Sequence, residues 1–202
     1  MTASTSPQRV GHRAGAEGFR RGGPKILIAG LGNLILGDDG VGVHAVRRMK
    51  NEAPRGVTVV EVGTAVMDAL HLLEKADKVL VIDALQAGGV PGTVYAARVA
   101  DLDNRGVQAS LHELNLLAAL HFLKRWPEIL ILGVEPETIQ LGMTLSPRVE
   151  AAIPELIRHV REAVGRWRRA PPLVHNSRHG PTRKRTSTGP KASCPVRRRL
   201  PA

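Results

Sequence analysis

The chain has 202 residues, which suits one domain with terminal extensions, and its 43% of hydrophobic residues can bury a sizeable core. The formal net charge of +11 belongs to the chain ends, because the net charge is zero over residues 24–170, +3 over residues 1–23 and +8 over residues 171–202. The single cysteine, Cys194, excludes a disulfide framework and a cysteine-based metal site, and no apolar run approaches the roughly 20 residues of a membrane helix. We therefore expect a cytoplasmic, monomeric protein without a membrane partner.

Composition divides the chain into three regions. Residues 1–23 are rich in Gly, Ser and Arg without periodicity and are predicted to be a disordered extension. Residues 24–170 carry the strand and helix patterns of an α/β domain. Residues 171–202 combine many prolines with eight basic residues and no acid, and are predicted to be a basic, disordered tail of undetermined partner.

Apolar runs and helical periodicity alternate within the domain. The predicted strands cover residues 25–30, 57–61, 78–83, 93–99 and 128–134, and the predicted helices cover residues 38–52, 65–76, 111–124 and 146–168. The link over residues 86–92 is short and rich in Gly, so the fourth strand is expected to be antiparallel to its neighbour. Ser146 and Pro147 resemble an N-cap and a first helical position. This order predicts a mostly parallel sheet with one antiparallel strand and helices on both faces.

Three polar residues occupy similar places in this pattern. Asp39 follows the first strand, Asp83 ends the third, and His112 opens the third helix. Carboxyl ends of parallel strands share one edge of a sheet, so Asp39 and Asp83 are expected to meet there, and His112 joins them if the preceding loop returns to that edge. Two carboxylates and an imidazole could bind a divalent transition metal such as nickel or zinc, or perform acid–base chemistry.

Each of these residues also has a structural interpretation. Asp38 or Asp39 could cap the following helix and complement its dipole. His112 could be an ordinary helix-start histidine, whereas Asp83 is harder to explain, because a buried carboxylate is costly without a partner. Residues 135–137, Glu-Pro-Glu, could line the cleft or form a solvated loop.

The sequence gives little support for several other kinds of active site. The turn that begins at Gly30 lacks the third glycine of a dinucleotide fingerprint, and the chain has no Gly-Lys-Ser/Thr P-loop. It also has no Gly-x-Ser-x-Gly nucleophile elbow and no cysteine in the domain.

The chain resembles the hydrogenase maturation endopeptidases over roughly residues 25–168. The most specific motif is GLGNLILGDDGVGVHAV at residues 30–46. Further motifs follow in the family's order, namely Gly-Thr at 63–64, VLVIDAL at 79–85, Pro-Gly-Thr at 91–93, the His-x-x-x-Leu start at 112, LGVEPE at 132–137 and LSPRVE at 145–150.

The resemblance implies a three-layer α/β fold with a five-stranded twisted sheet, and an aspartic-type peptidase that removes the C-terminal extension of the nickel–iron hydrogenase large-subunit precursor. It implies that Asp39, Asp83 and His112 contact nickel already inserted in that substrate. Asp39 or Asp38 is our candidate for activating the attacking water. Gly63 and Thr64 would bind substrate, although Glu61-Val62 departs from the Asp-Gly-Gly-Thr type sequence of the family. We interpret the glycines before Asp38 as making room for the substrate chain.

Two other functions remain open from the sequence. Residues 30–33, Gly-Leu-Gly-Asn, also resemble the start of peptidyl-tRNA hydrolases, but the Thr-Arg-His-Asn sequence of that family is absent and the domain is electrically neutral. No nucleic-acid partner is therefore expected for the domain. A non-catalytic, nickel-sensing maturation factor could use the same three site residues.

Overall fold

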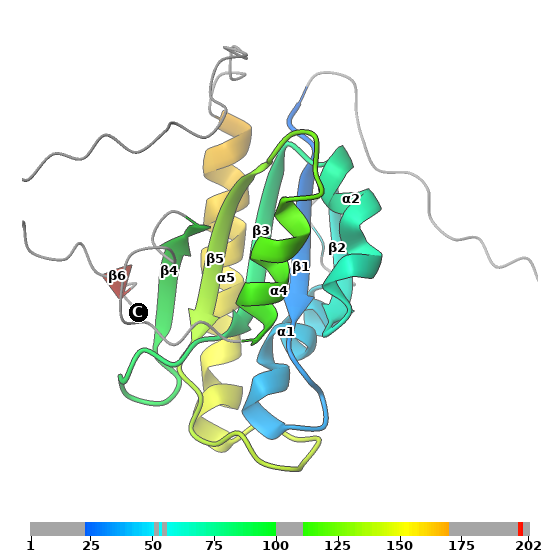
Figure 1. The fold of residues 1–202 in the computed structure, drawn as a ribbon. Coiled ribbons are helices and arrows are strands. Elements are labelled where there is room, and N and C mark those ends of the chain that lie inside the picture. Colours follow the sequence, from blue (N-terminus) through cyan, green and yellow to red (C-terminus); the bar gives the residue numbers. More distant parts are fainter. Residues whose placement is uncertain (1–22, 51–52, 54–55, 100–110, 170–197, 200–202) are drawn as a thin grey trace, which may run out of the picture.

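A twisted, mostly parallel sheet lies between two layers of helices (Figure 1) in the computed structural model, which describes residues 23–50, 53, 56–99, 111–169 and 198–199. Four strands are parallel and a fifth is antiparallel to its neighbour. Their order across the sheet is β2 (Val57–Gly63), β1 (Ile26–Leu31), β3 (Lys78–Ala84), β5 (Glu128–Val134) and β4 (Val94–Arg98). The predicted α/β fold is confirmed.

The helices divide between the two faces of the sheet. On one face lie α1 (Val41–Met49) and α5 (Pro147–Arg169), and on the other lie α2 (Leu70–Lys75) and α4 (Leu111–Leu120). Two short 3-10 helices, η1 (Gly37–Gly40) and η2 (Val66–Ala69), precede α1 and α2. The two predicted helices that begin at residues 38 and 65 therefore each start with a 3-10 turn.

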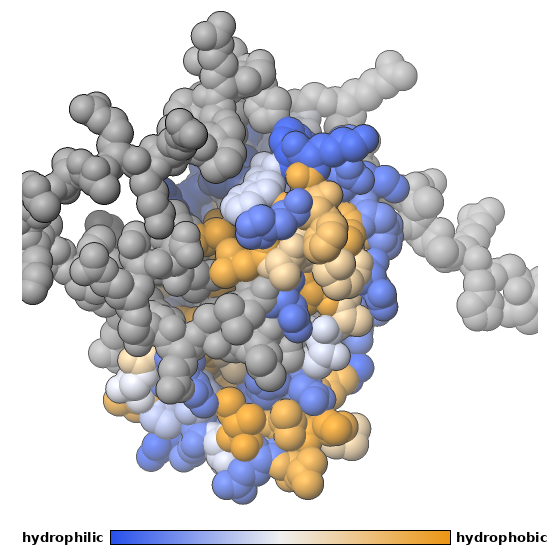
Figure 2. Space-filling model, viewed as in Figure 1, coloured by the Kyte–Doolittle hydropathy of each residue, from blue (hydrophilic) through white to orange (hydrophobic). Residues whose placement is uncertain are grey.

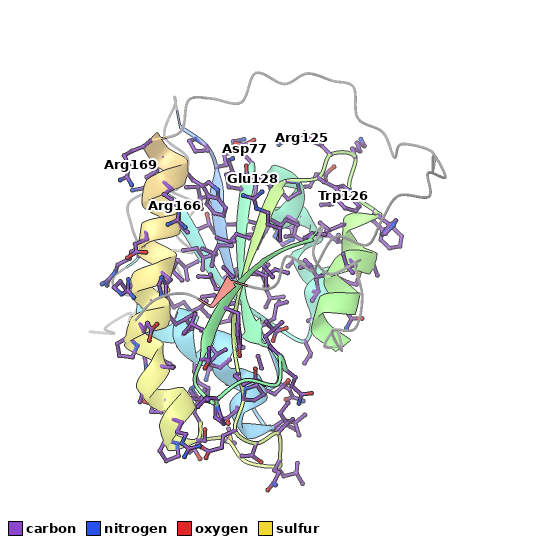
Figure 3. All side chains as sticks on the ribbon, turned by 90° about the vertical axis from the view of Figure 1, so that its left-hand side faces the viewer. Asp77, Arg125, Trp126, Glu128, Arg166 and Arg169 are labelled. Carbon is purple, nitrogen blue, oxygen red and sulfur yellow. The ribbon has the colours of Figure 1, made fainter. Side chains whose placement is uncertain are left out.

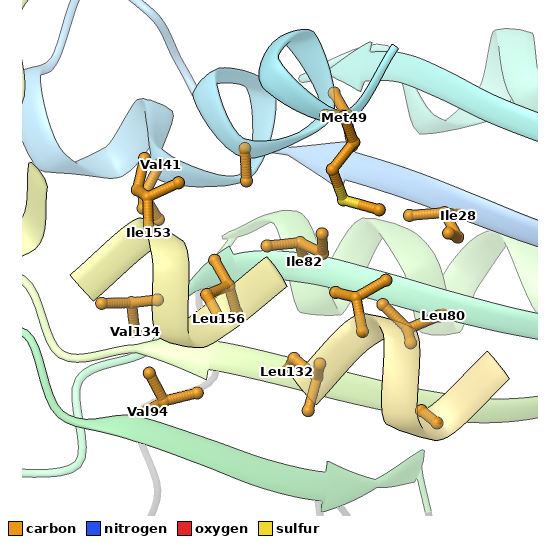
Figure 4. Packing of buried hydrophobic residues seen from close by; sticks show 14 of the residues in the cluster. Ile28, Val41, Met49, Leu80, Ile82, Val94, Leu132, Val134, Ile153 and Leu156 are labelled. Atoms are coloured by element: carbon orange, nitrogen blue, oxygen red, sulfur yellow. The ribbon is translucent and has the colours of Figure 1, made fainter. Parts of the chain in front are cut away.

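Successive side chains of the central strands point to opposite faces, and both faces are apolar. Ile26 and Ile28 of β1 pack towards α1 and α5, whereas Leu27 and Leu31 pack towards α2 and α4. Figure 4 shows the first cluster, in which Ile28, Leu80 and Ile82 of the strands meet Met49 of α1 and Leu156 of α5. Burial of each such side chain stabilises the fold by about 1.5–3 kcal/mol.

Strand β4 is antiparallel, but its partner is not the strand that precedes it in the chain. It pairs with β5, which lies between β3 and β4. The link over residues 85–93 passes the end of β5, where the N–H of Leu85 donates to the carbonyl of Val134 and the N–H of Gly92 donates to the carbonyl of Glu135. The short link therefore leads from β3 to β4 without pairing these two strands, because it passes over the end of β5, which lies between them.

The prediction that the Ser146 side chain caps α5 is wrong. Pro147 does begin α5, and the Ser146 carbonyl accepts a hydrogen bond from the N–H of Glu150. The Ser146 hydroxyl is buried and has no hydrogen-bond partner in the described part of the chain. Its backbone N–H instead donates to Asp38, so this residue connects α5 to η1.

The predicted disordered regions over residues 1–23 and 171–202 lie outside the described residues, apart from residue 23 and residues 198–199. Arg198 and Arg199 form the two-residue strand β6, which pairs with β4 at Ala96 and Tyr95 and was not expected from the sequence. No helix in the described ranges has the length and apolar character to cross a membrane.

Charged side chains gather at the amino end of the parallel strands, as Figure 3 shows for Asp77, Arg125 and Glu128. Arg125 donates to Asp77 over 3.0 Å. The buried ammonium of Lys78 pairs with Glu128, and the indole N–H of Trp167 donates to the same carboxylate over 3.0 Å. These pairs close the end of the core that faces away from the predicted site.

Glu128 is expected to make the stability depend on pH. Burial raises the pKa of this carboxyl, but the hydrogen bonds from Lys78 and Trp167 and the charge of Lys78 outweigh burial and hold the pKa below its usual value of 4.5. The unfolded chain therefore takes up the proton first, so this stabilisation is present above about pH 4.5 and is lost as the pH falls below it.

Glu128→Gln should lower the free energy of unfolding at pH 7 by about 1 kcal/mol, because the half-exposed carboxylate is partly screened by solvent. In urea unfolding, the difference between wild type and variant should shrink between about pH 5 and about pH 3. A difference that stays constant over this range would contradict the assigned ion pair.

Candidate active site at the carboxyl end of the sheet

β1 and β3 are neighbours in the sheet, but their connections leave in opposite directions. After β1 the chain passes through α1 to β2 on one side, and after β3 it passes to β4 and β5 on the other. In open α/β sheets, ligands bind outside the carboxyl ends of strands at such a switch point. Asp39 follows β1, and Asp83 is the penultimate residue of β3, so the fold brings both to this point.

Asp39 lies on η1 and is held by the turn that follows β1. Its side chain is buried, and its Oδ2 accepts a hydrogen bond of 2.8 Å from the backbone N–H of Asn33. Gly32 adopts a φ of +112°, and a Cβ at this position would lie 1.8 Å from the Asp39 carbonyl oxygen. The turn therefore needs glycine at Gly32 to pack against the backbone of Asp39.

Asp83 is fully buried, and its Oδ1 accepts a hydrogen bond of 2.9 Å from the N–H of Ala84. The first turn of α1 rests directly on the ends of β1 and β3. A Cβ at Gly42 would lie 2.1 Å from the carbonyl oxygen of Ile82 and 2.5 Å from that of Leu31. This close approach brings η1, which carries Asp39, into contact with β3, which carries Asp83.

His112 is the second residue of α4, whose first turn lies at the end of the molecule where the parallel strands finish (Figure 1). The backbone thus returns to the edge that the sequence predicted. The side chain of His112 lies outside the described part of the structure, so its meeting with Asp39 and Asp83 stays a prediction. Among the side chains that are described, no group of three His, Cys, Asp or Glu residues could hold a metal ion.

Asp38 connects two distant segments and caps neither helix. No side-chain hydrogen bond caps η1 or α1. Oδ2 of Asp38 accepts from the N–H groups of Glu137 and Thr138 over 2.9 and 3.1 Å, and Oδ1 accepts from that of Ser146 over 2.7 Å. The fully buried carboxylate thereby holds both ends of the 137–146 segment against η1. Predicting a helix cap at this carboxylate was wrong.

Asp38→Asn is expected to lower the free energy of unfolding by about 2–3 kcal/mol. An amide has one acceptor oxygen, so at least one of the three N–H donors would face an NH₂ group in a buried site. Urea unfolding measures the loss, and Asp68→Asn on the exposed part of η2 serves as a control within about 0.5 kcal/mol of wild type. Equal stability of the two variants would contradict the role of Asp38.

Glu135 performs a similar task at the end of β5. Its carboxylate is buried and accepts hydrogen bonds of 2.9–3.2 Å from the N–H groups of Ala87 and Gly88. It therefore fixes the link between β3 and β4 beside Asp83. Of the two carboxylates in the Glu-Pro-Glu sequence, Glu135 is thus the one that stabilises the carboxyl edge of the sheet. Glu137 reaches Arg148 at 3.5 Å.

An open pocket of about 330 Å³ lies between the turn after β1 and the end of β2. Its lining comes from the turn after β1, from α1 and from the end of β2, and comprises Gly32, Asn33, Leu34, Val43, Glu61, Val62, Gly63 and Thr64. Asn33 both lines the pocket and donates to Asp39. The predicted substrate-binding residues Gly63 and Thr64 thus line the same pocket as Asn33, whose N–H donates to Asp39.

Glu61 pairs with Arg47 of α1 and with Lys50, which directly follows α1. Arg47 and Lys50 contact its two carboxylate oxygens at 3.0 and 3.2 Å. Burial raises the pKa of Glu61, but hydrogen bonds and charge from Arg47 and Lys50 outweigh it and lower the pKa overall. Glu61 is therefore an ionised, paired residue of the pocket wall at neutral pH.

The glycines before Asp38 have a packing role in the fold, and their role in making room for a substrate chain stays a prediction. A Cβ at Gly30 would lie 2.3 Å from the carbonyl oxygen of Gly42, so Gly30 permits the packing of β1 against α1. Gly32 packs against Asp39 and also lines the pocket. Gly30 and Gly32 thus let the backbone pack closely at the start of α1 and around Asp39.

The chain matches known proteins at the level of sequence and structure. The model of the HycI family, hydrogenase maturation protease, matches residues 43–163. Hydrogenase 2 maturation protease of Escherichia coli (strain K12) is 32% identical over 69% of this chain and 90% of its own length. Hydrogenase expression/formation protein HupD of Bradyrhizobium diazoefficiens is 30% identical over 76% and 88% of the two chains.

Solved structures agree with these relatives. The hydrogenase maturating endopeptidase HybD from E. coli superposes with a TM-score of 0.63 at 29% identity, over 70% of this chain and 93% of that one. The hydrogenase 2 maturation peptidase from a Thaumarchaeota archaeon superposes with a TM-score of 0.54 at 32% identity, over 70% and 98%. These matches disfavour the peptidyl-tRNA hydrolase alternative. The chain belongs to the hydrogenase maturation protease family.

Proposed function

We propose that this peptidase removes the C-terminal extension of a nickel–iron hydrogenase large-subunit precursor after nickel has been inserted. The observation that carries the proposal is the position of Asp39 and Asp83, two buried carboxylates at the switch point of the sheet. An open pocket beside Asp39 leaves room for an extended peptide. Membership of the family supplies the class of reaction and of substrate.

The nickel of the precursor belongs to the substrate in this proposal. Carboxylate and imidazole groups are suitable ligands for a divalent transition metal, so Asp39, Asp83 and His112 would contact the nickel centre and position the extension. The backbone around both aspartates is closely packed at Gly32 and Gly42. Rigid placement of the carboxylates would favour a precursor that already carries its metal ion.

Hydrolysis of the peptide bond requires a base for the attacking water and a proton for the leaving amine. Asp39 is the better candidate for the base, because both oxygens of Asp38 are engaged by three backbone N–H groups. A carboxylate in this role makes the peptidase aspartic in type. Asp38 then acts as a positioning residue that fixes η1 against the 137–146 segment.

The pocket beside Asp39 is proposed to hold the residues that flank the cut. Gly63 ends β2 with a φ of +60°, Thr64 follows it, and both line the pocket. The N–H of Gly32 donates to the carbonyl of Gly63 over 3.2 Å, so the wall is joined to the turn that supports Asp39. An extended substrate chain along this wall would pass next to the proposed base.

Incubation of the protein with a nickel-loaded large-subunit precursor tests the proposed function. Intact-mass analysis should show the precursor shortened by its C-terminal extension, together with the released peptide. Binding of the precursor without any change in its mass would instead establish a nickel-sensing factor and overturn the proposal.

A further inference from the structure

Exposed apolar side chains gather at the carboxyl end of the sheet, where the candidate site lies. Eight large hydrophobic residues in the described part of the chain are exposed, and six of them follow the ends of β1, β2, β3 or β5. Figure 2 shows the resulting hydrophobic surface at the lower end of the molecule. These six residues are Ile35, Met67, Val90, Ile139, Leu141 and Met143.

Four of the six form one ridge, which we call the apolar ridge and which consists of Ile35, Ile139, Leu141 and Met143. Leu141 is 85% exposed and Met143 is 69% exposed. Two loops far apart in sequence pair there, because the N–H of Gly142 donates to the carbonyl of Ile35 over 3.0 Å, and the N–H of Gly37 donates to the carbonyl of Gly142 over 2.8 Å. The ridge is therefore a two-loop structure with its own backbone hydrogen bonds.

The same loops are attached to the candidate site. Asp38 holds both ends of the 137–146 segment through three backbone hydrogen bonds, and it directly precedes Asp39 on η1. His44 of α1 hydrogen-bonds to the backbone of Met143. Burial and the charges of Arg47 and Arg48 lower the pKa of His44, so its ring is neutral at pH 7. A surface held in place before binding loses little conformational entropy when a partner docks.

We propose that the apolar ridge is the docking surface for the folded body of the large-subunit precursor, an inference that rests on the proposed function. A precursor whose C-terminal peptide bond reaches Asp39 must place its folded part beside this edge of the sheet, and the ridge is continuous with that edge through Asp38. Leu141 and Met143 would enter an apolar depression of the precursor. The ion pair between Arg148 and Glu137, which lies two residues before Ile139, supplies a polar rim of balanced charge.

The chemistry of the ridge favours this occupant. Exposed apolar patches of this kind mark protein contacts, and a few apolar anchors at the centre of an interface carry most of its binding energy. The carboxylates that act on the substrate lie in the buried site, and the ridge itself carries no charged side chain. Binding and cleavage are thereby divided between the ridge and the aspartates.

The test compares Leu141→Ser/Met143→Ser with Phe122→Ser, using the full chain and the nickel-loaded precursor. Phe122 is 70% exposed but follows α4 at the opposite end of the molecule, so it controls for loss of an exposed apolar side chain. We expect KM, and Kd measured by calorimetry, to rise at least tenfold for the ridge variant with kcat within twofold of wild type. Phe122→Ser should match wild type in KM, kcat and Kd, and thermal unfolding should be alike for all three proteins.

Several results would overturn the docking surface. These are wild-type KM and Kd in the ridge variant, or a fall in kcat without a change in KM. Self-association of wild type that disappears in the ridge variant would assign the ridge to a second copy of this chain instead. If wild type binds the precursor and does not cleave it, the proposed function fails, whereas the Kd values still decide whether the ridge docks the precursor.

Discussion

Asp39→Asn and Asp83→Asn are each expected to slow removal of the extension by about 10³-fold or more. Both changes keep the size of the side chain and one acceptor oxygen, so the N–H of Asn33 can still donate at residue 39 and that of Ala84 at residue 83. The negative charge that would contact the nickel centre and accept a proton from water is lost. The single-turnover rate on nickel-loaded precursor measures the effect.

Asp68→Asn is the matched control for this experiment. Asp68 is an exposed aspartate of η2 at the same end of the sheet, and it should keep the wild-type rate. Thermal unfolding separates loss of chemistry from loss of fold, because the site variants should unfold cooperatively within a few degrees of wild type. Wild-type rates for both Asp39→Asn and Asp83→Asn would show that these carboxylates do not act in the reaction.

Gly42→Ala should destabilise the fold by about 3 kcal/mol. The new Cβ would lie 2.1 Å from the carbonyl oxygen of Ile82 and 2.5 Å from that of Leu31. Both contacts are backbone atoms at the ends of central strands, so α1 would have to move away from the sheet and displace η1.

Gly165→Ala in α5 is the control for this experiment. At Gly165 the nearest heavy atom to a new Cβ is the end of the flexible Arg169 side chain, at 3.3 Å. Alanine is the better helix former, so this variant should gain about 0.5–1 kcal/mol. Urea unfolding of the two variants should therefore shift in opposite directions, and a stability of Gly42→Ala equal to wild type would contradict the packing of α1 on the strand ends.

The central strands and the family were predictable from local sequence. β1 and β3 are continuous apolar runs, and strands covered on both faces show that pattern without any knowledge of their partners. Asp83 stood out because an acid that ends such a run is buried. The motifs at residues 30–46 and 79–85 identified the family, which the comparisons confirm.

Long-range pairing was not predictable in the same way. Asp38 is followed at once by a helix, so a helix cap was a natural prediction, but its donors lie 99, 100 and 108 residues further along the chain. The pairing of β4 with β5 likewise depends on a strand that comes later in the sequence. The sequence could place Glu135 at the carboxyl edge of the sheet. Its hydrogen bond from the N–H of Ala87 could not be predicted, because it depends on the path of the link between β3 and β4.

The most direct test of the account is the nickel dependence of cleavage. Wild-type protein is incubated with the same large-subunit precursor in nickel-loaded and nickel-free forms, and the masses of both are followed over time. The account predicts that the loaded precursor loses its C-terminal extension and that the nickel-free precursor keeps its full mass. Cleavage of both forms at the same rate would contradict a site in which Asp39 and Asp83 contact nickel carried by the substrate.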